Sequence, residues 1–151
     1  MWFDDLKDGF SESVWQEDAA PYLVETSHAA RGADLETTVP AERVADAARV
    51  MYEAMFSLEA ITGMDWIVEG RMELVYDYVQ FSSGRRVTVR ASVPREAPGL
   101  PTVSMIYPGA EWHEREAQDF FGFIFIGHPD PTPLLLPEDA DFHPLRKDFT
   151  G

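Results

Sequence analysis

Residues 71–93, RMELVYDYVQFSSGRRVTVRASV, carry the strongest strand pattern of the chain. Met72–Phe81 is rich in aromatic and β-branched residues, a composition typical of a β-strand. Residues 82–84, Ser-Ser-Gly, favour a tight turn. Along Arg86–Val93, valine and alanine alternate with arginine, threonine and serine. The two segments are therefore predicted to form an antiparallel hairpin with one buried face.

The residues before this hairpin predict a further antiparallel strand, a helix and a short strand. Residues 64–69 are separated from the hairpin only by the turn signal Gly70-Arg71, so they are predicted to pair with it as neighbours. Residues 33–39 resemble a short strand that leads into Pro40. An amphipathic helix is predicted after this proline and is expected to end at Gly63, because apolar residues recur at helical spacing: Val44, Ala48, Met51, Met55 and Leu58.

Composition narrows the class of protein. The chain has 151 residues and a formal net charge of −15, so phosphate backbones and anionic membrane surfaces would repel it. A hydrophobic share of 45% indicates a globular protein. The absence of cysteine excludes disulfides, thiolate zinc sites and iron–sulfur ligation by this chain. With no signal-peptide pattern and no apolar run of about 20 residues, we expect a cytoplasmic protein.

Three regions are predicted. Residues 1–32 form an acidic N-terminal arm with one short helix, in which Phe10, Val14 and Trp15 have helical spacing and Pro21 follows. Its aromatic residues fit equally well with packing on the same domain or on a neighbouring chain. Residues 33–126 form the domain, an α+β fold with a small, mostly antiparallel sheet covered by helices.

Residues 127–151 are predicted to be an extended, proline-rich, partner-binding tail. Prolines 129, 131, 133 and 137 exclude a helix or an interior strand, because proline lacks a backbone donor and restricts its predecessor. The stretch nevertheless contains Leu134-Leu135-Leu136. The sheet of the domain can accept some of these side chains. The more specific hypothesis is that a partner chain covers them.

Residues 111–119, EWHEREAQD, are the densest polar segment and predict a helix. Arg115 stands four residues from both Glu111 and Asp119, so a solvated helix with salt bridges is one interpretation. Another is a metal-dependent hydrolase that uses Glu114, Glu116, Asp119 and a histidine. Ala117 stands where His-Glu-x-x-His needs its second histidine, which weakens that alternative. An acidic regulatory binding module is a third possibility.

The remaining candidates lie at the histidines and near the C-terminus. His113, His128 and His143 are 15 residues apart, and one hypothesis is a shared metal site. Two of them precede proline, which favours turn or hydrogen-bonding roles instead. Leu145 and Phe149 flank Arg146-Lys147 as an anchor pair in a groove would, with Arg146 available for a partner carboxylate. The alternative is a frayed, solvated end.

One region resembles a known family. It runs through Pro108-Gly109-Ala110, Trp112, Glu114-Arg115-Glu116, Asp119-Phe120-Phe121-Gly122, Phe125, Gly127-His128-Pro129-Asp130 and His143-Pro144-Leu145-Arg146-Lys147-Asp148-Phe149. This pattern is similar to the signature of the 30-kDa subunit of respiratory complex I, the NADH dehydrogenase, a module also found in energy-converting membrane-bound [NiFe] hydrogenases. No arginine follows Asp130 closely and the chain lacks the long C-terminal extension expected of a complex I subunit, which favours the hydrogenase type or another compact relative.

The resemblance implies a non-catalytic subunit of the hydrophilic arm of a membrane-bound, ion-translocating oxidoreductase, peripheral to the membrane on its cytoplasmic side. No cofactor is expected in this chain; iron–sulfur clusters, and NiFe, flavin or quinone, belong to partner subunits. The implied partners are the iron–sulfur small-subunit homologue and the 49-kDa or hydrogenase large-subunit homologue. The residues expected at partner interfaces are Glu114, Arg115, Glu116, Asp119, His128, Pro129, Leu135, His143, Pro144, Leu145, Arg146, Lys147 and Asp148.

Overall fold

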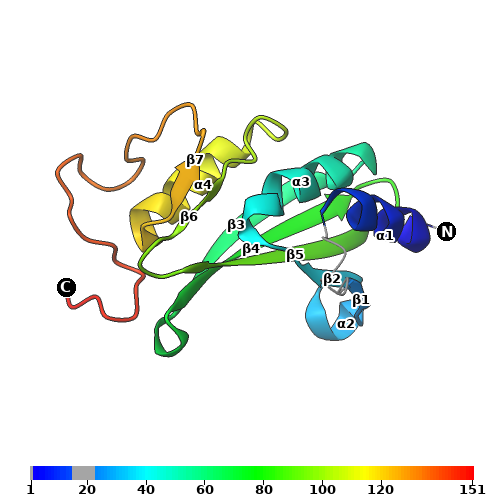
Figure 1. The fold of residues 1–151 in the computed structure, drawn as a ribbon, viewed down its shortest axis with the longest axis horizontal. Coiled ribbons are helices and arrows are strands. Elements are labelled where there is room, and N and C mark those ends of the chain that lie inside the picture. Colours follow the sequence, from blue (N-terminus) through cyan, green and yellow to red (C-terminus); the bar gives the residue numbers. More distant parts are fainter. Residues whose placement is uncertain (1, 15–22) are drawn as a thin grey trace.

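The protein folds as a five-stranded sheet in the order β1-β2-β5-β4-β3, with a smaller parallel sheet, β6-β7. The structure is a computed structural model that describes residues 2–14 and 23–151. In Figure 1, α3 and α4 lie on the same side of the main sheet, with α1 beside α3. The elements are α1 (Trp2–Ser13), β1 (Leu23–Glu25), α2 (His28–Arg31), β2 (Leu35–Thr38), η1 (Ala41–Arg43), α3 (Val44–Glu53), β3 (Ser57–Trp66), η2 (Ile67–Glu69), β4 (Arg71–Gln80), β5 (Arg85–Pro94), β6 (Gly99–Pro101), α4 (Ala110–Phe121) and β7 (Ile124–Ile126).

The predicted hairpin and its buried face are confirmed. β4 pairs with β5 and with β3, both antiparallel, while β2 joins β5 in parallel. The inward side chains of β4 and β5 pack under the helices because a strand places alternate side chains on one face. They are Met72, Leu74, Tyr76, Tyr78, Val87, Val89, Ala91 and Val93, each at most 2% exposed.

The opposite face of the sheet is polar and carries ion pairs within and between its strands. Arg90 Nη1 lies 3.1 Å from a carboxylate oxygen of Glu73, and Arg71 Nη1 lies 3.2 Å from the other. Arg86 pairs with Glu59 on β3. The alternation in β5 therefore separates a helix-covered face from a charged face, and the α+β class is confirmed.

The predicted helix ends earlier than expected. α3 stops at Glu53, and β3 begins at Ser57 instead of residue 64. Met55 adopts a left-handed backbone conformation (φ 65°), which reverses the chain. The residues that follow then gain a ladder with β4, which outweighs helical periodicity. The prediction was wrong for Met55, which is 77% exposed, and for Leu58, which belongs to β3.

Gly63 does not end a helix; it lies within β3 under the aromatic ring of Phe121. A Cβ atom at Gly63 would stand 2.6 Å from Phe121 Cδ2. The missing side chain therefore lets α4 approach the strand closely.

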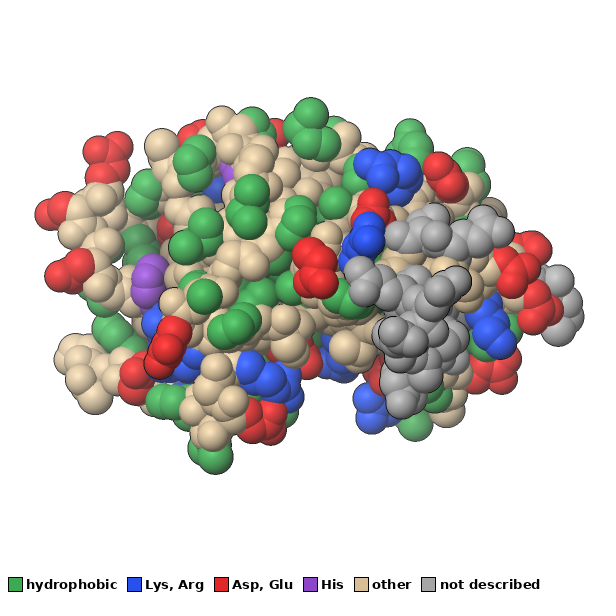
Figure 2. Space-filling view, viewed as in Figure 1, with side chains coloured by type: hydrophobic (Ala, Val, Ile, Leu, Met, Phe, Trp, Pro, Cys, Tyr) green, Lys and Arg blue, Asp and Glu red, His purple; other side chains and the backbone are tan. Residues whose placement is uncertain are grey.

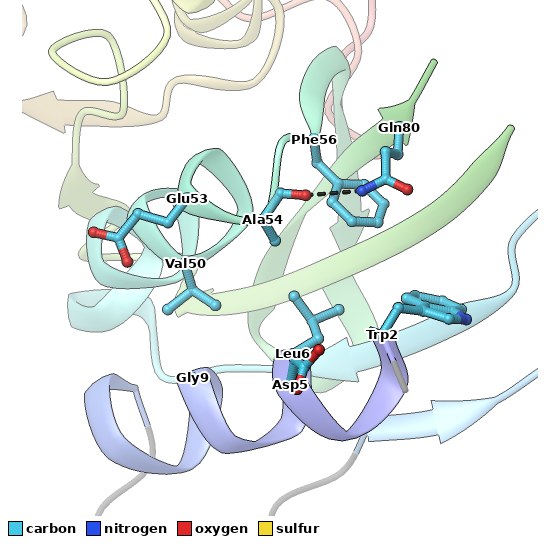
Figure 3. Close-up of a pocket in the computed structure, with 9 residues that line it drawn as sticks. All are labelled: Trp2, Asp5, Leu6, Gly9, Val50, Glu53, Ala54, Phe56 and Gln80. Carbon is cyan, nitrogen blue, oxygen red and sulfur yellow. Dashed lines mark hydrogen bonds between the residues drawn. The ribbon is translucent and has the colours of Figure 1, made fainter. Parts of the chain in front are cut away.

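The N-terminal helix packs on its own domain. Leu6, Phe10 and Val14 are buried in the core, which fits the first of the two alternatives for this region. Figure 3 shows Leu6 and Val50 pointing into the space between α1 and α3, a cavity of about 460 Å³. Trp15, Pro21 and Tyr22 lie outside the described residues.

Candidate functional site

The candidate site is α4 together with residues 127–151, called here the C-terminal segment. This segment contains no helix or strand, and in Figure 1 it arches away from β7 and returns past α4. α4 ends where Gly122 takes a left-handed conformation (φ 85°) and its N–H donates to Gln118 O. A Cβ atom at Gly122 would stand 2.8 Å from both His143 Nε2 and Arg146 Nη2, so glycine lets the segment close over the helix end.

Asp119 holds the middle of the C-terminal segment. Its Oδ2 atom accepts hydrogen bonds from the backbone N–H groups of Leu134, Leu135 and Leu136, at 3.0, 2.6 and 3.1 Å. The residue is 4% exposed. One buried carboxylate oxygen therefore satisfies three donors that have no helix or strand to join.

Arg115 and Gln118 hold the proline-rich start of the segment. Arg115 donates from Nε to Thr132 O at 2.9 Å and from Nη2 to Pro133 O at 3.1 Å. Gln118 Nε2 donates to Pro131 O at 2.7 Å. The predicted bridge from Arg115 to Glu111 and Asp119 is wrong, because backbone carbonyls outside regular structure and Asp130, 3.5 Å away, take the guanidinium instead.

The end of α4 binds the returning part of the segment. Leu145 N–H donates to Phe120 O at 3.0 Å, and Arg146 Nε donates to Phe121 O at 2.6 Å. His143 Nδ1 lies 2.9 Å from Asp119 O. Part of the Arg146 guanidinium, expected to be available for a partner, is therefore bound within the chain.

A second anchor lies at the end of β3. The fully buried carboxylate of Asp65 accepts two hydrogen bonds from Arg95, at 2.8 and 3.0 Å, and one from Lys147 N–H at 2.8 Å. Arg95 also donates to Asp148 at 2.7 Å. The hydrogen bonds from Arg95, opposed by burial, hold the pKa of Asp65 below its usual value. The segment is thus fixed to the domain at two separate places.

Asp65, Arg95 and Gln118 were not predicted as site residues. Asp65 lies on the inward face of β3, where a charged residue needs a partner. The inward position of this charged residue can be recognised only once the strand is known to begin at Ser57.

Glu114 is wholly buried and joins the domain to the start of the segment. Its Oε1 accepts from Val103 N–H at 2.7 Å, and its Oε2 accepts from Thr102 Oγ1 at 2.5 Å. His128 Nε2 lies 3.7 Å from Oε2. Asp130 N–H donates to His128 Nδ1, so Nε2 carries the proton and donates to Glu111 O at 3.2 Å. The interpretation of this region as a solvated helix is therefore wrong at Glu114.

Burial raises the pKa of the Glu114 carboxyl above its ordinary value of 4.5, partly opposed by its hydrogen bonds. The folded state then binds this proton more tightly than the unfolded state. The contribution of Glu114 to the free energy of unfolding consequently falls as the pH rises from 4.5 through the folded pKa of this group. We expect Glu114→Gln, which keeps the shape and an acceptor, to lose less stability than the wild type over that range.

Urea unfolding at steps between about pH 4 and pH 7 measures this difference, and parallel curves for the two proteins would contradict the assignment. Asp65 does not interfere, since its lowered pKa acts below 3.8.

The structure does not bring the hydrolase candidates together. Glu114 and Asp119 are buried with separate partners, while Glu116 is exposed. In the described part of the chain, no group of three histidine, aspartate or glutamate residues is arranged to hold a metal. His128 and His143 instead bind backbone groups, as their positions before proline favoured.

The C-terminal segment presents apolar side chains outward. Leu135, Leu145, Phe142 and Phe149 are 60%, 52%, 40% and 39% exposed, and the last two rings stack 5.8 Å apart. Figure 2 shows acidic side chains at the edge of the molecule where Figure 1 places the arch of the segment. The polar backbone faces α4, and the surface left open is mixed apolar and acidic.

Residues 37–151 match the sequence model of the family described as "Respiratory-chain NADH dehydrogenase, 30 Kd subunit". The C subunit of an NADH-quinone oxidoreductase from Roseiflexus sp. (strain RS-1) is 41% identical over 76% of this chain and 69% of its own length. The corresponding NADH-quinone oxidoreductase subunit of Salinispora tropica is 35% identical over 98% of this chain, which spans 61% of that protein.

Two solved structures share the fold. One protein of the membrane-bound sulfane sulfur reductase, an archaeal respiratory membrane complex, superposes with a TM-score of 0.77 at 33% identity, covering 97% of this chain and 84% of its own. The trypsin-resistant fragment (1-134) of Nqo5 gives a TM-score of 0.59 at 34% identity over 64% of this chain and 81% of its own. Within the residues that the structure describes, no helix is long and apolar enough to cross a bilayer.

Proposed function

Because the chain belongs to the family of the 30 kDa subunit of respiratory-chain NADH dehydrogenase, we propose that it is a non-catalytic subunit of a membrane-bound, ion-translocating oxidoreductase. The complex is of the NADH:quinone oxidoreductase or energy-converting [NiFe] hydrogenase type. The protein belongs to its hydrophilic arm, peripheral to the membrane on the cytoplasmic side. It joins neighbouring subunits there and takes no part in electron transfer.

One observation carries this proposal: α4 binds the backbone of the C-terminal segment and leaves its apolar side chains exposed. The donors of residues 134–136 and the carbonyls of residues 131–133 are satisfied within the chain. Leu135 and Leu145 remain in solvent in the isolated protein. A segment ordered in this way binds a partner without a large cost in conformational entropy.

The proposed partners are the iron–sulfur small-subunit homologue and the 49-kDa or hydrogenase large-subunit homologue. These proteins hold the iron–sulfur clusters and the NiFe, flavin or quinone sites. The sequence described here has no cysteine, which supports placing the clusters elsewhere.

The residues proposed for the interface fall into two groups. Glu114, Arg115, Asp119, His128 and His143 shape the segment from within the chain. The groups proposed to touch partners are Glu116, Pro129, Leu135, Pro144, Leu145, Arg146, Lys147 and Asp148.

The double variant Leu145→Ala with Arg146→Ala tests the proposal. Both side chains lie on the segment, so the domain should stay folded while incorporation into the complex falls on the order of tenfold or more. The measurement is the amount of tagged subunit that copurifies with iron–sulfur absorbance from solubilised membranes.

Val24→Ala with Arg31→Ala is the matched control, since Val24 is as exposed as Leu145 (52%) and Arg31 forms an exposed ion pair far along the chain. If the Leu145 and Arg146 variant assembles normally, the C-terminal segment is not part of the interface. A wild-type protein that behaves only as a stable monomer in its own cells would refute the subunit role itself.

A further inference from the structure

Among the residues that the structure describes, the outer edge of β3 has no hydrogen-bonding partner. β3 is the last strand of the main sheet and pairs with β4 alone. In the described ranges, residues 2–14 and 23–151, no backbone or side-chain group outside β4 and the following turn η2 is found bonded to the main chain of Ser57–Trp66. A ten-residue edge with unpaired N–H and C=O groups is a template for another extended chain.

Three adjoining hollows of about 180, 320 and 420 Å³ lie along this strand and are together called the groove. The first two share Gly63, Phe121 and Leu145, and the second and third share Asp65, Trp66 and Lys147. The strand therefore forms one wall of the groove from Ile61 onward.

The groove is built by contacts already described. Phe121 packs on Gly63 and so brings the end of α4 beside the strand. The bond from Leu145 N–H to Phe120 O sets the side chain of Leu145 over the gap, and the bond from Lys147 N–H to Asp65 fixes the far end. The groove thus exists only when the C-terminal segment is held in place.

The lining is apolar in the middle and oppositely charged at its two ends. Leu145, Trp66 and Val68 are 52%, 37% and 98% exposed along it. Glu116 stands at the end near Ile61, and Lys147 and Glu69 stand at the end near Val68. Glu69 is paired with Arg71, which leaves the positive charge of Lys147 at that end. Glu116 and Lys147 are exposed.

We propose that this groove binds an extended segment of a partner subunit, which pairs with the free edge of β3 as an additional strand. The unpaired backbone groups require an extended chain, and the apolar lining requires apolar side chains on alternate residues. The charged ends require a basic residue near Glu116 and an acidic residue near Lys147. A second copy of this chain is the less favoured occupant, because two molecules of net charge −15 repel each other.

This inference rests on the proposed function, and hydrogen exchange of the full-length protein separates the two. Exchange is measured residue by residue for the isolated protein and for the assembled complex. Alternate amides between Ile61 and Trp66, those that face the groove, should exchange rapidly in the isolated protein and at least about tenfold more slowly in the complex.

Three results would overturn the β3 site. Unchanged β3 amides beside newly protected amides in residues 131–149 would leave the subunit role standing and remove this groove from it. Protection of the β3 edge in the isolated protein, together with a dimer mass by sedimentation, would assign the edge to a second copy. Absence of the protein from any complex would refute both proposals.

Lys147→Gln tests the polarity of the groove, and Lys7→Gln is the matched control because these are the only two lysines. Each removes one positive charge from an exposed side chain, and Lys7 lies on α1 away from the groove. We expect Lys147→Gln to lower incorporation several-fold more at low salt than at high salt, with Lys7→Gln close to wild type. Equal effects of the two variants would count against a charged end at Lys147.

Discussion

Replacement of Asp65 with alanine is expected to lower the free energy of unfolding by about 3–5 kcal/mol. The variant leaves Arg95, whose side chain is only 17% exposed, without its bidentate partner, and it also releases Lys147 N–H. Urea unfolding at neutral pH measures the loss. Because the pKa of Asp65 is lowered in the folded state, its contribution is present above 3.8 and disappears as the pH falls below that value.

Glu69→Ala is the control for this experiment. Glu69 lies near the same end of the sheet and pairs with Arg71, but its side chain is 53% exposed. An exposed pair of this kind contributes about 0–1 kcal/mol. Similar losses for the two variants would mean that the Asp65 anchor contributes little to stability.

Replacement of Asp119 with alanine is expected to release the C-terminal segment from α4 without unfolding the domain. The variant removes the acceptor of three backbone N–H groups. Hydrogen bonds to a charged group contribute about 1.5–3 kcal/mol each and are not additive, so docking of the segment should weaken by about 3 kcal/mol. Limited proteolysis should then cleave residues 131–142 on the order of 100-fold faster, while the main thermal transition shifts little.

Asp119→Asn keeps one oxygen acceptor and should give a smaller increase in cleavage. Asp139→Ala, which removes an exposed carboxylate from the same segment, controls for the loss of an acidic residue. If Asp119→Ala resists protease as the wild type does, the segment is held mainly by its other contacts.

The elements that were predicted correctly depend on contacts close together in the chain. The hairpin of β4 and β5 follows from a run rich in aromatic and β-branched residues, a short turn and a run that alternates strictly. The helix over residues 111–119 follows from a polar, proline-free run before Gly122, and it forms as α4. The core positions of Val44, Ala48 and Met51 follow from helical spacing within α3.

Competition between local preferences and distant pairing explains the errors. Helical spacing continues through Met55 and Leu58, but β4 offers Ser57 and its successors a strand partner. The spacing of apolar residues within one segment cannot indicate that partner, because the partner lies elsewhere in the sequence. For the same reason Arg115 was assigned to nearby carboxylates, whereas the carbonyls that it meets lie more than ten residues away.

Local patterns and the family signature were sufficient for the α+β class, the buried face of the sheet and the family, because alternation, helical spacing and ordered motifs are properties of neighbouring residues. Only the tertiary structure placed Asp65 against Arg95 and Lys147, buried Glu114, and aimed three leucine amides at Asp119. A buried carboxylate needs donors wherever the fold brings them, and those donors come from segments far away in the sequence. The C-terminal segment closes over the end of α4 and thereby forms the groove beside β3. That surface therefore also exists only in the folded protein.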